Sequence, residues 1–306
     1  MKAATSVGVE ARPYAGPEAF QVVLVRPPGY VHAAALNEVA ESVYYGLRSL
    51  GVNATLAVNH LVVPGPPILL FGAHLLKEQE AAQVPDSTII YNLEQVSPES
   101  TWTSPVYMSL LRRCPIWDYS ARNLEALAEL GITSRTKHVP VGYVPELTRI
   151  EPSPTQDIDV LFYGSVNDRR ARALTQVKAR GLNVQAIFGV YGSDRDELIA
   201  RSKVVLNLHF YESSIFELVR VSYLLANRKA VVAECHPRTE IDPEIATAVR
   251  LATYEGLADA CVELVADTKA RRELERRALA AIAARPETVY LARALRTPDL
   301  ADLGQP

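Results

Sequence analysis

The organisation of this chain is clearest in one segment, Asn207-Leu-His-Phe-Tyr-Glu-Ser-Ser-Ile-Phe-Glu-Leu-Val-Arg-Val-Ser-Tyr-Leu-Leu-Ala-Asn-Arg-Lys-Ala-Val-Val-Ala-Glu234. An apolar strand at 204–208 leads into a polar loop, a helix at 215–227 and a second apolar strand at 230–233. Two apolar strands joined by a helix form the unit of a parallel sheet, because parallel pairing needs a crossover connection. Ligands bind in such sheets at loops that follow the carboxyl ends of strands. The segment therefore predicts an α/β fold with a candidate binding loop, and an ordinary serine-capped helix is an equally good interpretation.

The same alternation extends on both sides of this segment. Further strands are expected at 21–25, 54–58, 67–71, 88–91, 116–119, 137–141, 158–163, 183–188 and 249–252. Further helices are expected at 34–50, 105–113, 122–130, 169–180, 195–202, 256–267 and 269–284. Ser193 or Asp194 is expected to cap the helix at 195–202. Residues 145–157 are rich in proline, lack a buried pattern and are interpreted as a linker. The sequence thus predicts two Rossmann-like, doubly wound parallel-sheet domains, at 1–150 and 151–306.

Composition indicates a globular protein without a strong electrostatic partner. Apolar residues make up 48% of the 306 residues, and the formal net charge is −3, so we expect no nucleic-acid partner. Cys114, Cys235 and Cys261 are widely spaced, which predicts neither disulfides nor a zinc site and fits a reducing compartment. Neither a signal peptide nor a long apolar run is recognised, so we expect a cytoplasmic protein without a membrane span.

Several classes of enzyme are disfavoured by the motifs that the chain lacks. The dinucleotide fingerprint G-x-G-x-x-G follows none of the predicted strands, which weighs against NAD and FAD. The P-loop motif and the G-x-S-x-G elbow are also absent. Two Rossmann-like domains facing each other across a cleft are still compatible with dehydrogenases, binding proteins and GT-B glycosyltransferases.

Three blocks of the sequence resemble GT-B glycosyltransferases of the group 1 type, including CgeB-like enzymes. The first is Trp117-Asp-Tyr-Ser-Ala-Arg-Asn-Leu-Glu-Ala-Leu-Ala-Glu-Leu-Gly131 with His138-Val-Pro-Val-Gly-Tyr-Val-Pro145, which is similar to the exit from that family's first domain. The second, Asp159-Val-Leu-Phe-Tyr-Gly-Ser-Val-Asn-Asp-Arg-Arg170, resembles the first strand and phosphate loop of its donor domain. The third runs from Glu212 to Glu234. The resemblance implies a nucleotide-sugar donor on the C-terminal domain and an acceptor on the N-terminal domain.

Candidate donor-binding residues lie in the second and third blocks. A glycine at Gly164 allows close approach of the backbone, and Arg169 and Arg170 could neutralise a diphosphate, although a solvated helix start is the alternative. The resemblance implies that Glu217 binds the ribose and Arg220 lies near phosphate, whereas a plain ion pair one helical turn apart is the alternative. The other expected donor contacts are Ser165, Tyr191, His209, Glu212 and Ser213. Retaining members of the family often carry two glutamates with seven residues between them; Glu212 and Glu217 have only four between them, so the stereochemical outcome stays open.

Candidates for the catalytic base lie in the N-terminal half. In inverting GT-B enzymes a histidine or carboxylate near His32 deprotonates the acceptor, and a helix-capping role for His32 is the equal alternative. Glu94 is a rival base or acceptor contact, and Asp118 is another candidate that burial would make structural. The two D-x-D strings, starting at Asp157 and Asp194, precede a strand and open a helix, so we expect no metal site and no cofactor.

The preferred hypothesis is a metal-independent glycosyltransferase that moves a sugar from a nucleotide diphosphate sugar to a glycan or small-molecule acceptor. The alternatives are a non-catalytic nucleotide-sugar or carbohydrate-binding protein and a nucleotide-sugar epimerase or hydrolase on the same scaffold. A homodimer is compatible with the sequence. Closure of the domains on the ligand is expected about a hinge within residues 143–157.

Overall fold

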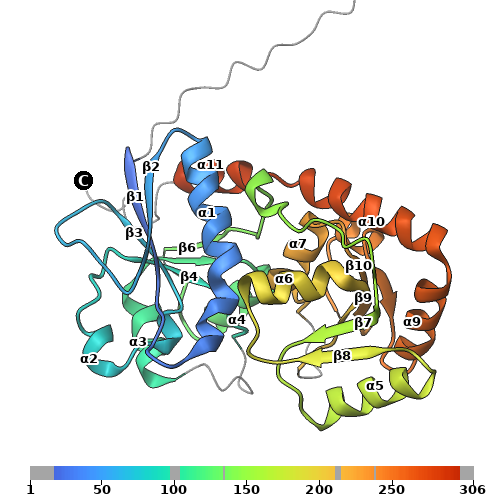
Figure 1. Cartoon of the computed structure of the whole chain (residues 1–306). Coiled ribbons are helices and arrows are strands. Elements are labelled where there is room, and N and C mark those ends of the chain that lie inside the picture. Colours follow the sequence, from blue (N-terminus) through green and yellow to red (C-terminus); the bar gives the residue numbers. More distant parts are fainter. Residues whose placement is uncertain (1–16, 97–103, 134, 211–214, 238, 297–306) are drawn as a thin grey trace, which may run out of the picture.

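The computed structural model describes residues 17–96, 104–133, 135–210, 215–237 and 239–296. Across this part of the chain, two parallel β-sheets lie side by side, and apolar side chains pack against helices on both faces of each sheet (Figure 1). This arrangement confirms the expected α/β class with two Rossmann-like, doubly wound domains.

The first sheet has the strand order β2-β1-β3-β4-β5-β6, and its pairings are parallel. Its strands are β1 (Ala19–Leu24), β2 (Asn53–Val58), β3 (Ile68–Phe71), β4 (Ile89–Asn92), β5 (Ile116–Asp118) and β6 (Thr136–His138). Strand β3 is buried along its whole length, as expected for an apolar strand between two layers of helices. The helices are η1 (Val31–Leu36), α1 (Asn37–Ser49), η2 (Ala73–Leu75), α2 (Glu78–Ala81), α3 (Pro105–Arg113) and α4 (Ala121–Glu129).

The second sheet has the strand order β11-β10-β9-β7-β8, again with parallel pairings. Its strands are β7 (Ile158–Tyr163), β8 (Val184–Ile187), β9 (Ser202–Asn207), β10 (Ala230–Glu234) and β11 (Arg250–Ala252). The helices are η3 (Pro145–Leu147), α5 (Asp168–Ala179), α6 (Gly192–Arg201), α7 (Leu218–Ala226), α8 (Pro243–Thr247), α9 (Leu257–Ala266) and α10 (Thr268–Ala283). The winding direction reverses between β7 and β9, and in the first sheet between β1 and β3, which are the points where open parallel sheets bind ligands.

Two helix starts differ from the sequence-based expectation. Helix α7 begins at Leu218 rather than at 215, because Ile215 forms an isolated parallel bridge with Glu240 and Phe216 is buried in the core. Glu217 consequently occupies the N-cap position instead of the first turn. Helix α6 begins at Gly192, so Ser193 and Asp194 lie inside its first turn and do not precede it as a cap.

The segment interpreted as a linker is packed for about half of its length. Leu147 and Ile150 are buried in the core of the second domain. The side-chain oxygen of Asn227 accepts hydrogen bonds from the backbone N–H groups of Arg149 and Ile150, both at 2.8 Å. The expectation that 145–157 lacks a buried pattern is therefore wrong for 145–150, since a few apolar residues spaced along a proline-rich segment do not register as a periodic pattern.

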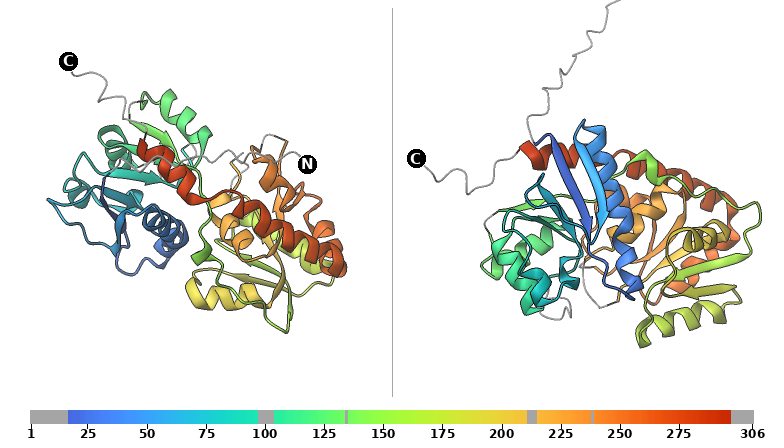
Figure 2. Two further views of the ribbon diagram at one scale, coloured as in Figure 1. Left: turned by 90° about the horizontal axis from the view of Figure 1, so that it is seen from above. Right: turned by 60° about the vertical axis from the view of Figure 1, so that its left-hand side comes forward.

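Helix α11 (Glu287–Arg296) follows α10 and returns to the first domain, where no element was expected (Figure 2). It packs against α1, and a Cβ atom at Gly46 would lie 2.7 Å from Leu291 Cδ1. At the crossing, the N–H of Tyr143 donates to the carbonyl of Arg285, and the N–H of Glu287 donates to the carbonyl of Tyr143, both at 2.9 Å. The two chain crossings between the domains are thus joined to each other.

None of the helices in the described ranges has the length and apolarity that a bilayer span requires.

Candidate active site between the domains

A cavity of about 400 Å³ lies between the two domains. The first domain contributes Ala35, Glu38, Leu93, Glu94, Gln95 and Tyr119 to its wall. The second domain contributes Tyr163, Gly164, Ser165, Arg170, Ile187, Gly189, Val190, Tyr191, Arg195, Phe210, Glu217, Val219, Arg220 and Tyr223. Several of these residues directly follow strands β4, β5, β7 and β8, so the carboxyl ends of both sheets face one cavity.

Gly164 ends strand β7 at a point where two guanidinium groups meet. Its φ angle is +141°, a backbone conformation that residues with a side chain rarely adopt. A Cβ atom at this position would lie 3.2 Å from Arg220 Nη2 and 3.5 Å from Arg170 Nη1. Glycine therefore lets the backbone of this loop approach both arginines closely.

Arg170 joins the loop after β7 to the loop after β9. Its side chain is 2% exposed and donates to the carbonyls of Ser165, at 2.9 Å, and of His209, at 3.3 Å. It also donates to the carbonyl of Leu208 and, at 3.2 Å, to Glu217 Oε1. Burial lowers its pKa to about 10, which leaves the group charged at neutral pH. Most of its donors are satisfied internally, so Arg170 mainly fixes the shape of the cavity wall.

Arg220 is the most exposed of the guanidinium groups that line the cavity. Its side chain is 23% exposed, compared with 2% for Arg170 and 5% for Arg195. Its Nη1 atom lies 2.8 Å from Glu217 Oε2, and the group sits 5.4 Å from the centre of the Tyr163 ring. The pair is partly buried, since the Glu217 side chain is 17% exposed, and Arg220 is the guanidinium group in the cavity wall that is most open to a ligand.

Two of the expected donor residues lie away from this cavity. Arg169 forms an ion pair with Glu234, stacks at 4.2 Å on the ring of Tyr254 and lines a separate depression. His209 lines the same depression, is 2% exposed, and has no hydrogen-bond partner at either ring nitrogen in the described part of the chain. The loop residues Glu212 and Ser213 lie outside the described residues.

His32 connects the two domains at the edge of the cavity. Its Nδ1 atom lies 2.9 Å from the hydroxyl of Tyr191, and its ring stacks on Phe188 with centroids 4.3 Å apart. Tyr191 lines the cavity, whereas His32 does not. His32 lies in η1, after β1, and there it contacts Phe188 and Tyr191, which follow β8 in the second domain.

Glu94 reaches the cavity from the loop after β4. Burial raises its pKa to about 7, because the ionised carboxylate is poorly solvated there. Its N–H donates to Asn92 Oδ1 at 3.0 Å, and its carbonyl accepts from Asn123 Nδ2 at 2.9 Å. A carboxyl held in a cavity with a pKa near neutrality can accept a proton from a bound hydroxyl.

Asp118 contacts the two asparagines that hydrogen-bond the backbone of this loop, and it does not line the cavity. It is fully buried and accepts from Asn92 Nδ2 at 2.6 Å, from Asn123 Nδ2 at 3.0 Å and from the N–H of Ser120 at 2.8 Å. Burial raises its pKa to about 7, against the opposing effect of these hydrogen bonds. Asp118 therefore has the structural placement that burial was expected to give it.

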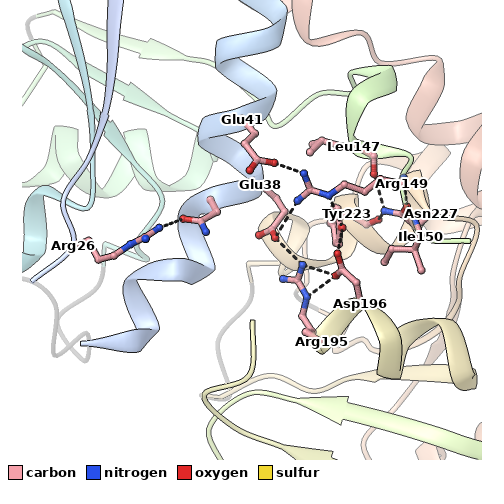
Figure 3. A network of polar contacts seen from close by, with 11 residues as sticks. Arg26, Glu38, Glu41, Leu147, Arg149, Ile150, Arg195, Asp196, Tyr223 and Asn227 are labelled. Carbon is pink, nitrogen blue, oxygen red and sulfur yellow. Dashed lines mark hydrogen bonds and ion pairs between the residues drawn. The ribbon is translucent and has the colours of Figure 1, made fainter. Parts of the chain in front are cut away.

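A polar network between the domains was missed by the sequence analysis (Figure 3). Arg195 Nη2 lies 2.7 Å from Glu38 Oε1, and both residues line the cavity. Tyr223 donates to Asp196 at 2.7 Å and accepts from Arg149 Nε at 3.0 Å. Glu38 and Arg195 lie in different domains and become partners only when the domains dock, whereas Tyr223 and Asp196 both belong to the second domain.

In the ranges that the structure describes, no group of three or more histidine, cysteine, aspartate or glutamate side chains is placed to hold a metal ion. The D-x-D residues are engaged elsewhere. Asp157 forms an ion pair with Arg201, Asp159 lies 2.6 Å from Lys203, and Asp196 belongs to the network between the domains.

Sequence comparison finds distant relatives only. No protein-family model matches this chain. Uncharacterized protein L140 of Acanthamoeba polyphaga mimivirus is 23% identical over 186 residues, which is 58% of this chain and 59% of that protein. Uncharacterized protein L137 of the same virus is 27% identical over 161 residues, which is 49% of this chain and 21% of that protein. The chain thus covers less than two thirds of the length of either relative.

Solved structures share the architecture over most of the chain. Anabaena Alr3699/HepE, crystallised with UDP-glucose, has a TM-score of 0.59 and 14% identity, covering 90% of this chain and 98% of that one. WaaG, a glycosyltransferase of lipopolysaccharide biosynthesis, has a TM-score of 0.57 and 11% identity, covering 92% and 100%. A mutant of T4 phage BGT, in complex with UDP-glucose, has a TM-score of 0.54 and 11% identity, covering 91% and 100%. These likenesses confirm the architecture expected from the sequence: the chain has the GT-B fold.

Proposed function

We propose that this chain is a glycosyltransferase that moves a sugar from a nucleoside diphosphate sugar to a hydroxyl-bearing acceptor. The observation that carries the proposal is the cavity between the domains, which is lined by Arg220 of the second domain and by Glu94 of the first. One wall offers a cationic group suited to phosphate, and the other offers a carboxyl suited to an acceptor hydroxyl. The UDP-glucose present in the HepE and T4 BGT structures supports a nucleotide sugar as the donor.

The donor diphosphate binds against the second domain. Arg220 exchanges its pairing with Glu217 for a charge-assisted contact with phosphate, and Gly164 lets the backbone approach the same group. Helix α7 begins at Leu218, and its N-terminus contributes a partial positive charge. Glu217, released from Arg220, accepts hydrogen bonds from the ribose hydroxyls. Arginine and the helix terminus together supply the positive charge at this end of the cavity, so the reaction needs no metal ion.

The acceptor hydroxyl binds against the first domain and loses its proton to Glu94. The oxygen then attacks the anomeric carbon while the bond to the diphosphate breaks, and the leaving group keeps the electron pair. A single displacement of this kind inverts the anomeric centre. Glu94 fits this role because it lines the cavity, and the role proposed for His32 in the sequence analysis stays a prediction. We place the reaction in the cytoplasm, where free cysteines such as Cys114 and Cys261 persist as thiols.

Product analysis tests the proposal. The protein is incubated with UDP-glucose carrying a labelled glucose, with and without EDTA, and the products are separated by mass spectrometry. We expect UDP release with the label on a new acceptor, a glycan or a small molecule added from a panel, and no effect of the chelator. The matched variant Glu94→Gln keeps the size of the side chain and is expected to bind UDP without transferring sugar. Label recovered only in free glucose, in an epimerised nucleotide sugar or in the intact donor would instead indicate a hydrolase, an epimerase or a binding protein.

A further inference from the structure

The loop that carries Glu94 is fixed at its backbone by side chains that water does not reach. Asn92 and Asn123 are fully buried. Asn92 accepts from the N–H of Glu94 and donates to its carbonyl, and Asn123 donates to the same carbonyl. Tyr107 donates to Asn92 Oδ1 at 2.6 Å and so extends the network toward helix α3. These contacts fix the position from which the Glu94 side chain starts, but they leave its carboxyl group to be oriented by something else.

His74 is the side chain that contacts this carboxyl group. It lies in η2, directly after β3, and β3 pairs with β4 in the sheet, so the two loops leave the same edge side by side. His74 Nε2 lies 3.4 Å from Glu94 Oε1, and their side chains are 7% and 22% exposed. The edge of the Tyr107 ring packs against the His74 ring with centroids 5.9 Å apart. Within the described residues, His74 makes the one ion-pair or hydrogen-bond contact that is recorded for the Glu94 carboxyl.

The backbone geometry before His74 fits this placement. Gly72 has a φ angle of +77°, and a Cβ atom there would lie 3.2 Å from the carbonyl oxygen of Val25 and 3.1 Å from Leu36 Cδ1. Glycine thus allows the chain to turn sharply between β3 and η2 where the neighbouring loop passes close by. The turn brings an imidazole to a buried position beside the cavity, where an apolar side chain would otherwise be expected.

We propose that His74 is a positioning residue for Glu94, donating its Nε2–H to the ionised carboxyl and so fixing both its orientation and the pH at which it becomes a base. The inference rests on the proposed function, because the acceptor hydroxyl is the group from which Glu94 takes its proton. His74 itself does not touch the substrate in this account. It acts through its contact with Glu94.

The protonation states of the two groups fit a neutral donor beside a titrating carboxyl. Burial lowers the pKa of His74 to about 4, so its ring is neutral at pH 7, whereas burial raises the pKa of Glu94 to about 7. At neutral pH the contact therefore joins a neutral imidazole to a titrating carboxyl, with 3.4 Å between His74 Nε2 and Glu94 Oε1, and it is not a salt bridge. The other titratable groups that face Glu94 are Tyr30, Tyr107 and Tyr119; Asp118 faces the last two, and Glu217 faces Tyr119 from the second domain. None of these groups is a cation that could replace His74.

The test compares two variants of His74 that differ in one property. His74→Leu removes the donor and keeps the site apolar, whereas His74→Gln keeps an N–H donor of similar reach. Glutamate is labelled with ¹³C at Cδ, and the Glu94 signal is identified by its loss in Glu94→Gln. We expect the pKa of Glu94 to rise by about one to two units in His74→Leu, since a hydrogen bond to the charged form is lost, and to return close to the wild-type value in His74→Gln. Isothermal calorimetry with UDP is expected to give the same affinity for all three proteins.

A second measurement follows activity across the pH range. The pH dependence of kcat/KM for UDP-glucose turnover is expected to move upward with the Glu94 pKa in His74→Leu. At pH 7, kcat is expected to fall about five- to fiftyfold with KM for the donor unchanged, because a rise of one to two units from about 7 lowers the ionised fraction of Glu94 by that factor. An unmoved Glu94 signal in His74→Leu, in a protein that binds UDP normally, would overturn the positioning role. A Glu94 signal that moves as expected while Glu94→Gln retains full turnover would leave the pairing in place and would instead remove Glu94 from the proposed reaction.

Discussion

Glu287 offers a quantitative test of the structure because it is a buried carboxyl at the crossing between the domains. Its side chain is 1% exposed, and its Oε2 atom accepts from the N–H of Gly142 at 2.6 Å and from the hydroxyl of Ser42 at 3.3 Å. The second oxygen, Oε1, has no hydrogen-bond partner in the described ranges. Burial raises the pKa of Glu287 from 4.5 to about 7, because the charged form is poorly solvated.

The raised pKa makes folding less favourable as pH rises. Below pH 4.5 both the folded and the unfolded chain hold the proton on Glu287. Between pH 4.5 and about 7 the unfolded chain releases it first, so the free energy of unfolding falls with pH. Since one pKa unit corresponds to about 1.4 kcal/mol, the rise to about 7 corresponds to a loss of about 3 kcal/mol that is complete above pH 7.

The substitution Glu287→Gln removes this titration and keeps an acceptor for the N–H of Gly142. Urea unfolding followed by circular dichroism at pH values from 4 to 8 measures the free energy of unfolding of each protein. We expect the stability of the variant relative to wild type to increase by about 3 kcal/mol between pH 4 and pH 8. Glu129→Gln, at an exposed position of α4, is the control and is expected to show a difference that is constant within about 0.5 kcal/mol. A difference for Glu287→Gln that does not change with pH would refute the assignment of a neutral carboxyl at this site.

Three further predictions concern the cavity. Glu217→Ala is expected to weaken UDP binding by about ten- to a hundredfold in calorimetry, while Glu217→Gln keeps an acceptor for the ribose and stays within about threefold of wild type; equal affinities for all three would remove the ribose contact. Gly164→Ala is expected to lower UDP affinity by more than about tenfold, because its Cβ would displace Arg220, 3.2 Å away, and to lower the melting temperature because alanine is strained at a φ of +141°; unchanged binding would show that this close approach is not used. Small-angle scattering is expected to show a smaller radius of gyration at saturating UDP than for the free protein. Arg195→Met is expected to increase the radius of gyration of the free protein, because the contact between Arg195 and Glu38 is lost. An identical radius in all samples would count against domain closure.

The strands and their parallel pairing were predictable because apolar runs and the length of the crossovers carry most of the information about a parallel sheet, whereas no strand order was predicted. Strand β7 occupies the predicted range 158–163. Gly164 and Glu94 each follow a predicted strand, and this position indicated that both lie at the sheet edge where ligands bind. The side that a neighbouring residue faces was harder to predict. Arg169 and Arg170 are adjacent, yet successive helix positions differ by about 100° in direction, so one lines the cavity and the other does not.

Features that depend on the relative position of the domains could not be predicted from the sequence. The partner of Glu38 is Arg195, which is more than 150 residues away and becomes a neighbour only when the two sheets face each other. Helix α11 escaped notice because Pro286 interrupts the pattern after α10 and its buried face includes Glu287. The contact between His74 and Glu94 could not be predicted either, because no sequence pattern indicates that the short helix after β3 brings His74 next to Glu94.

Calorimetric titration with nucleoside diphosphates, in buffer containing EDTA, tests the central claim most directly. The wild-type protein and Arg220→Met are titrated with UDP, GDP, ADP, CDP and dTDP. We predict that at least one of them binds the wild-type protein without metal and binds Arg220→Met about ten- to a hundredfold more weakly, because a charged partner of the phosphate is lost. Binding of none of the five to the wild-type protein, binding that returns only when Mg²⁺ or Mn²⁺ is added, or equal affinity for both proteins would contradict the account.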